Sequence, residues 1–153
     1  MIRRYQPADC EDVLRVWARA SAVAHPFLSE EFLDLERHNI PTVYLPNAET
    51  WVWVAGEQVV GFVSLLGNEV GAIFVDPKFH RSGIGRALMD RARELRGALE
   101  VEVFERNLQG RAFYAKLGFT LMHRQVHDQT GFAVMRLRLD ANNPLQPTGY
   151  ADG

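Results

Sequence analysis

The hydrophobic positions of the chain change their period near residue 50. The segment TWVWVAGEQVVGFVSLLGNEVGAIFV, residues 50–75, contains three apolar runs separated by the turn-forming stretches AGEQ and GNE. Apolar runs of this length between turn signals are typical of neighbouring β-strands. We therefore predict an antiparallel meander with strands at about residues 50–55, 59–66 and 70–75.

Helical periodicity is found on both sides of this meander. A first helix is predicted after Asp9, a suitable N-cap. The residues of its apolar face are Cys10, Val13, Leu14, Trp17 and Ala20. A second helix follows the cap residue Ser29, and the segment NIPTVYLPN after it is predicted to be a loop because it contains two prolines. A third helix follows the meander. Its apolar stripe comprises Ile84, Leu88, Ala92 and Leu95.

In the C-terminal part of the chain, the apolar residues alternate between the period of a strand and the period of a helix. LEVEVF predicts a strand, residues 107–118 a helix, and the segments FTLMHRQV and FAVMRLRL a hairpin. The predicted order is β, α, α, β, β, β, α, β, α, β, β. We therefore predict an α/β fold with a mixed, mostly antiparallel sheet of about seven strands, about four helices and one central βαβ crossover. Residues 1–140 are predicted to form a single domain, and residues 141–153 a flexible C-terminal tail.

Composition and charge narrow the function classes. A formal net charge of -2 gives no reason to expect nucleic-acid binding, and no apolar run reaches the roughly 18 residues of a membrane helix. The segment MIRRYQPADC lacks the apolar core of a signal peptide, and Cys10 is the only cysteine. The histidines show no metal-ligand spacing such as HExxH, so no metal is expected. A cytoplasmic enzyme or binding module, with no nucleic-acid or membrane partner, is the class these features favour.

The segment HRSGIGRALMDRARE places two glycines where the third helix begins. A helix N-terminus offers unpaired backbone N–H groups and partial positive charge, and Gly83 and Gly85 would let a phosphate approach them. Arg81 and Arg86 add charge, so the expected guest is a pyrophosphate. A Walker loop is absent. A Rossmann turn would need a small residue at Leu88, so an NAD-binding fragment is a weakened alternative.

Two segments resemble one known family. VDPKFHRSGIGRALM is similar to the acyl-CoA-binding signature of the GNAT superfamily of N-acyltransferases, and NLQGRAFYAKLGF is similar to the next segment of that family. The resemblance extends over nearly the whole predicted domain. His80 stands where the family usually has Arg or Gln, and Arg81 stands where Gly is common.

The resemblance implies acetyl-CoA as a co-substrate and a way of binding it. The pyrophosphate would lie against the loop that comprises His80, Arg81, Ser82, Gly83, Ile84, Gly85 and Arg86. The pantetheine arm would pair with the strand residues Ile73, Phe74 and Val75, where this strand splays from Val101 and Val103. In the family the residue at Asn107 contacts the same arm or waters near it, and the resemblance implies this role for Asn107.

The implied reaction is direct attack of a neutral primary amine on the thioester. In the family the acid that protonates the leaving thiolate corresponds to Tyr114, seven residues after Asn107 and on the same helix face. Leu108, Ala112 and Ala115 are expected to form the buried face of this helix.

The sequence does not identify the general base. Glu69 is a candidate, and the alternative is that Glu69 is only a turn residue. His25 and Phe27 lie in AHPFLS, where the family builds its acceptor site, and packing is their alternative role. His123 and His127 fall on the last hairpin and are expected to be solvated.

The sequence thus predicts an N-acetyltransferase that transfers acetyl from acetyl-CoA to a primary amine. The acceptor, a small molecule or a peptide or protein, is not identified. A CoA-binding sensor or regulatory module with little catalysis is the alternative. A homodimer through the last strands is also considered, because an edge strand invites pairing.

Overall fold

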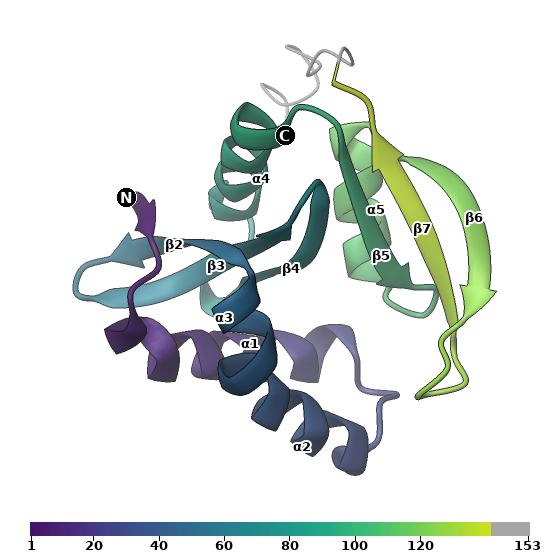
Figure 1. The fold of residues 1–153 in the computed structure, drawn as a ribbon, viewed down its shortest axis with the longest axis horizontal. Coiled ribbons are helices and arrows are strands. Elements are labelled where there is room, and N and C mark those ends of the chain that lie inside the picture. Colours follow the sequence, from purple (N-terminus) through teal and green to yellow (C-terminus); the bar gives the residue numbers. More distant parts are fainter. Residues whose placement is uncertain (142–153) are drawn as a thin grey trace.

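The computed structural model describes residues 1–141, which contain one seven-stranded mixed sheet (Figure 1). Its strands, in spatial order, are β1 (Ile2–Arg4), β2 (Glu49–Ala55), β3 (Gln58–Leu66), β4 (Glu69–Val75), β5 (Leu99–Phe104), β7 (Ala133–Leu139) and β6 (Thr120–Val126). Every neighbouring pair is antiparallel except β4 and β5, which are parallel. The predicted α/β fold with a mostly antiparallel sheet is confirmed.

Residues 1–141 contain four helices of ten or more residues. They are α1 (Cys10–Ala24), α2 (Glu30–Asn39), α4 (Ile84–Arg96) and α5 (Leu108–Leu117). Alternate residues of β3 enter different cores, with Phe62 packing in the α1 cluster and Val63 in the α4 and α5 cluster. The sheet is therefore covered on both faces, which explains why β3 is buried along nearly its whole length.

The helix α4 lies unusually close to the sheet at one point. A Cβ atom added to Gly61 of β3 would lie 3.1 Å from the Ile84 side chain and 3.3 Å from that of Leu88. Gly61 therefore lets the first turns of α4 rest directly on the strand. None of the helices in residues 1–141 is both long and apolar enough to cross a membrane.

The segment predicted as the loop NIPTVYLPN is helical, which corrects the prediction. Residues Ile40–Tyr44 form a π-helical turn, and Leu45–Asn47 form the short helix α3. Each piece has its proline in the first turn, where a helix needs no backbone N–H from that residue. The two prolines therefore lie at the starts of two short helical pieces and do not exclude helical structure.

Asp9 is the N-cap residue of α1, as predicted, but its side chain makes no cap bond to this helix and accepts hydrogen bonds from Arg3 and the Gln6 N–H. Two predictions about exposed and buried faces were wrong. Leu95, predicted on the apolar stripe of α4, is 37% exposed. On α5 the buried side chains are Tyr114 and Leu117. The predicted buried face, Leu108, Ala112 and Ala115, is exposed. Burying a tyrosine and a leucine removes more apolar area from water than burying two alanines.

The single crossover connects β4 to β5 through α4. Parallel pairing between the two strands covers only Glu69 with Glu100 and Val70 with Val101. In β4, Gly71 falls between two successive pairs with β3, so a β-bulge follows Val70 directly. A bulge bends its strand, and here the strands diverge from that point, as the ribbons in Figure 1 show.

The predicted flexible tail lies, apart from Ala141, outside the described residues. The prediction that residues 1–140 form a single domain stays a prediction.

Candidate active site

The divergence of β4 from β5 opens into a cavity of about 350 Å³. It reaches from the end of α1 across both strands to the start of α5. Among its lining residues are His25, Glu69, Phe74, Phe104, Asn107 and Tyr114. The structure therefore brings most of the predicted catalytic and acceptor-side residues to one place.

The strand edge that faces the cavity is partly unpaired. Residues 73–75 of β4 pair with β3 on one side, and pairing with β5 within residues 1–141 ends at Val70. Val101 and Val103 line the opposite wall, as predicted from the resemblance. An extended ligand of suitable length can therefore hydrogen-bond to β4 as an additional strand.

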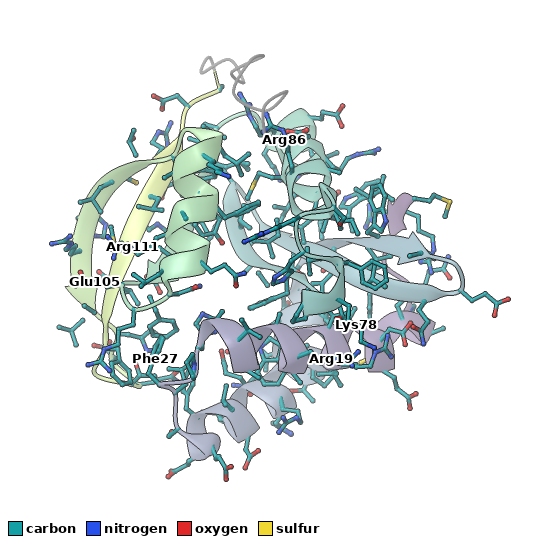
Figure 2. All side chains as sticks on the ribbon, turned by 180° about the vertical axis from the view of Figure 1, so that it is seen from behind. Arg19, Phe27, Lys78, Arg86, Glu105 and Arg111 are labelled. Carbon is teal, nitrogen blue, oxygen red and sulfur yellow. The ribbon has the colours of Figure 1, made fainter. Side chains whose placement is uncertain are left out.

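The loop that follows β4 is tied to α1 by a buried carboxylate. Asp76 is 4% exposed and accepts hydrogen bonds from the Lys78 N–H and from Arg19 of α1, each at 3.0 Å. Arg19 and Lys78 lie on the same side of the molecule (Figure 2). This anchor was missed as a site residue, although the sequence shows Asp76 in the Asp-Pro pair that ends the strand.

His80 connects the same loop to α5. Its Nε2–H donates to the Val75 carbonyl at 2.9 Å, and its Nδ1 accepts from the Gln109 side-chain amide at 3.1 Å. A neutral ring with the proton on Nε2 satisfies both partners. His80 thus braces the loop through protein contacts, at the position where the family usually has Arg or Gln.

The start of α4 needs left-handed backbone at two positions. Gly83 is the N-cap with φ 87°, and Arg81 has φ 66°, the only positive φ at a non-glycine among residues 1–141. A Cβ atom at Gly83 would meet nothing within 4 Å, so conformation rather than space favours glycine there. The Ser82 hydroxyl donates to the Phe79 carbonyl and closes the turn.

Gly85 has a second role that the sequence did not reveal. A Cβ atom there would lie 3.2 and 3.3 Å from two ring atoms of Phe113. The glycine therefore lets α5 approach α4, in addition to the predicted access of a ligand to the helix N-terminus. The sequence does not reveal this packing role, because Phe113 is distant from Gly85 in the sequence.

Tyr114 and Asn107 project from α5 into the cavity, as their two-turn spacing predicted. They are 7% and 8% exposed. Burial raises the pKa of the Tyr114 phenol above its usual value, so the phenol keeps its proton. Its ring makes edge contacts with Phe113 and Phe119, with ring centroids 5.4 Å apart in each pair. These contacts fix the ring at the cavity wall.

His25 and Phe27 form an aromatic wall with residues from other elements. The His25 ring meets Phe27, Phe74 and Phe104 edge-on, at centroid distances of 5.9, 6.4 and 5.3 Å. Burial lowers the pKa of His25 to about 4. Figure 2 shows Phe27 at the junction of the loop after α1 with the β6–β7 hairpin, where it contacts Phe132.

His127 belongs to this wall as well, so the expectation that it is solvated was wrong. It lines the cavity, and its ring meets Phe32 and Phe104 at 5.7 and 5.3 Å. No short-range pattern in the sequence marks these contacts, because they join α2, β5 and the hairpin.

Glu69 also lines the cavity, at the first residue of β4. Its carboxylate accepts a hydrogen bond from Arg136 at 2.9 Å, and Arg136 also binds Glu100 at 3.0 Å. The ion pairs run across β4, β5 and β7 at the end where the strands are still paired. Among residues 1–141, no group of His, Cys, Asp and Glu side chains has an arrangement that would hold a metal ion.

Comparison with known proteins identifies the family. Residues 46–121 match the model of the acetyltransferase (GNAT) domain. The peptidyl-lysine N-acetyltransferase YiaC of Escherichia coli is 35% identical over 134 residues, 85% of this chain and 90% of the relative. The chain belongs to the GNAT family. Like this relative, it is an N-acetyltransferase, and the weakened alternative of an NAD-binding fragment was wrong.

Solved GNAT structures match the fold. The solution structure of apo YjaB from Escherichia coli has a TM-score of 0.81 at 33% sequence identity, covering 90% of this chain and 95% of YjaB. The PaiA N-acetyltransferase of Thermoplasma acidophilum, crystallised with coenzyme A, has a TM-score of 0.70 at 18% identity and covers 89% of this chain and 96% of its own.

The left-handed backbone at Arg81 leads to a stability prediction. Arg81→Gly and Arg81→Ala remove the same exposed charge and differ only in the Cβ atom. Since a Cβ atom is disfavoured at φ 66°, we expect the free energy of unfolding of Arg81→Gly to exceed that of Arg81→Ala by about 0.5–1 kcal/mol. At an ordinary backbone position the alanine variant would be the more stable of the two. Urea unfolding of both variants measures the difference. Equal free energies of unfolding of the two variants would show that a Cβ atom at residue 81 causes no backbone strain.

The buried imidazole leads to a pH prediction. The folded-state pKa of His25, about 4, lies below its ordinary value of 6.5. Between these pH values the unfolded chain binds a proton that the folded chain does not, so this residue makes stability fall with falling pH. From pH 7 to pH 5 the loss is about 2 kcal/mol. Urea unfolding of wild type and His25→Phe at both pH values tests it, and an identical pH dependence would refute it.

Proposed function

We propose that this enzyme transfers the acetyl group of acetyl-CoA to the ε-amine of a lysine side chain in a peptide or protein. The observation that carries the proposal is the unpaired edge of β4 beside the buried Tyr114 and Asn107. The lysine acceptor is supported by YiaC and YjaB, both peptidyl-lysine N-acetyltransferases and both 35% identical to this chain.

In this proposal the cofactor follows the loop and then the strand. Its pyrophosphate lies against the backbone N–H groups of residues 81–86, with Arg81, Ser82 and Arg86 beside it. The pantetheine arm runs along residues 73–75, and the Asn107 amide contacts it. The coenzyme A complex of PaiA supports such a ligand in this fold. The loop is already held in shape by Asp76 and His80, so little ordering entropy is lost on binding.

The acceptor cavity is suited to a cation with an aliphatic stem. Glu36, Glu69 and Glu102 line it, and no Lys or Arg of residues 1–141 does. Among the described residues, Tyr44 donates to Glu36, Arg136 to Glu69 and Gln125 to Glu102. Phe74 and Phe104 line the cavity and supply apolar surface for a methylene chain, and Phe27 packs against Phe104. Carboxylates concentrate the protonated amine at the mouth of the site.

The chemistry requires three proton transfers. The ammonium loses one proton to the base, its nitrogen attacks the thioester carbonyl, and the tetrahedral intermediate expels the coenzyme A sulfur. Tyr114 gives its phenolic proton to that sulfur as the C–S bond breaks, and the second proton that the nitrogen loses as the amide forms restores the phenol. A backbone N–H of the unpaired β4 edge stabilises the oxyanion.

We retain Glu69 as the base, acting directly or through water. Its negative charge attracts the ammonium, whereas the Nε2 of His25 already faces the Asn107 amide at 3.3 Å. In this role Arg136 either breaks its ion pair with the Glu69 carboxylate or keeps it while the carboxylate also binds the water.

The proposal extends to location and assembly. A lone, half-buried Cys10 suits a cytoplasmic protein. A homodimer through β6 stays a prediction, which the exposure of this edge strand along its whole length favours.

The role of Tyr114 is tested by Tyr114→Phe, which keeps the ring and removes the proton. We expect kcat with acetyl-CoA and a lysine peptide to fall about 100-fold, as loss of a general acid does. The calorimetric Kd of acetyl-CoA should stay nearly unchanged. Release of free thiol measures turnover.

Two results would count against this function. Wild-type turnover in Tyr114→Phe would remove the phenol from the mechanism. Tight acetyl-CoA binding by the wild type without thiol release, over a panel of lysine peptides and small amines, would favour the sensor alternative.

A further inference from the structure

His25 and Asn107 are 82 residues apart in sequence, yet their side chains meet in the cavity. The Nδ2 atom of Asn107 lies 3.3 Å from the Nε2 atom of His25. The Oδ1 atom of Asn107 accepts a hydrogen bond from the Gly110 N–H at 2.9 Å. The orientation of the amide is therefore set, because its oxygen must face Gly110 and its NH₂ group must face His25.

This orientation determines the proton on the imidazole. An amide NH₂ group donates hydrogen bonds and accepts none, so Nε2 of His25 must be the acceptor. The neutral ring then carries its proton on Nδ1. The His80 ring has the opposite tautomer, since its Nε2 faces the Val75 carbonyl.

Packing holds both partners of this contact in place. A Cβ atom at Gly110 would lie 2.5 Å from the Nδ2 atom and 3.0 Å from the Cγ atom of Asn107, so the amide rests on bare backbone. His25 is held by three aromatic edges and by the bond of its backbone N–H to the Ser21 carbonyl at 2.8 Å. Neither side chain can turn without disturbing the cavity wall.

We propose that His25 is a positioning residue, whose Nδ1-protonated imidazole orients the Asn107 amide so that its second N–H is presented to the acyl-CoA arm. The inference rests on the function proposed above for the cofactor, and it changes the part assigned to His25. The ring acts on the cofactor through Asn107, and it forms the acceptor wall only with its remaining surface.

The low pKa of His25 supports this assignment, since a protonated ring would bring a second donor against the amide. The connection also links the loop after α1, on the acceptor side, with the first residue before α5, on the cofactor side.

Affinity measurements with three variants test the proposal. His25→Phe keeps an aromatic ring and loses the acceptor, so the Kd and KM of acetyl-CoA should rise about tenfold, the usual effect of one orienting hydrogen bond. His25→Gln places an oxygen acceptor near the position of Nε2 and should recover affinity to within about threefold of wild type. Gly110→Ala displaces the amide without touching His25 and should reproduce the loss.

The matched control is His127→Phe, which removes the other imidazole from the same cavity without a contact to Asn107. Its acetyl-CoA Kd should stay within about twofold of wild type. A role of His25 in acceptor binding alone would raise only the KM of the peptide, and that result would overturn the proposal. So would equal acetyl-CoA affinities of His25→Phe and wild type.

A second measurement does not depend on turnover or on cofactor binding. In NMR spectra of the protein with ¹⁵N-labelled histidine, His25 should be the Nδ1–H tautomer at pH 7, whereas Asn107→Ala should release that preference. An Nε2–H tautomer in the wild type would refute the inference, even if the enzyme acetylates lysine. Conversely, the predicted tautomer in a protein that binds no acetyl-CoA would refute the proposed function and leave the His25–Asn107 contact established.

Discussion

The ending of the hydrogen bonds between β4 and β5 after Val70 is the constraint on which the rest of the molecule depends. Parallel strands normally continue to pair, because unpaired backbone groups within a protein are costly. The bulge at Gly71 ends the pairing and turns β4 aside, so its edge remains open toward α5. The ion pairs of Arg136 with Glu69 and Glu100 hold the sheet together on the paired side. An open edge beside a rigid paired edge makes a groove that does not need to reorganise when an extended ligand binds.

Close approaches at three glycines bring the groove and its side chains together. Gly61 lets α4 rest on β3, Gly85 lets Phe113 of α5 approach α4, and Gly110 lets the Asn107 amide rest on its own helix. At Gly110 an added Cβ atom would overlap the Asn107 side chain, and at Gly61 and Gly85 the neighbouring side chains would have to move, because packed interiors have little spare volume. The shape of the loop between β4 and α4 therefore depends less on its own residues than on the surfaces on both sides of it. Asp76 and His80 complete this support by hydrogen bonds to α1, β4 and α5.

The cavity combines two environments that enzymes of acyl transfer need. Around Tyr114 and His25 the surroundings are apolar, so the phenol keeps its proton and the imidazole remains neutral. Around Glu36, Glu69 and Glu102 the lining is acidic, and no Lys or Arg of residues 1–141 lines the cavity, although Arg136 forms an ion pair with Glu69 at 2.9 Å. In the proposed function, the acidic region receives the charged acceptor and the apolar region holds the thioester.

The sequence alone determined the order of the strands and of the four long helices, the crossover, the position of the two glycines at the start of α4 and the shared face of Asn107 and Tyr114. These features follow from periodicity, capping and motif spacing, which act over a few residues. The tertiary structure decided which face of α5 is buried, the helical form of residues 40–47, and the contacts of His25, Phe104, His127 and Phe132. It also decided the close packing of Gly85 against Phe113 and the ion pair between Glu69 and Arg136. The reason is physical: these outcomes depend on volume, dielectric environment and hydrogen-bond partners supplied by distant segments, and no local pattern in the chain encodes which segments will meet.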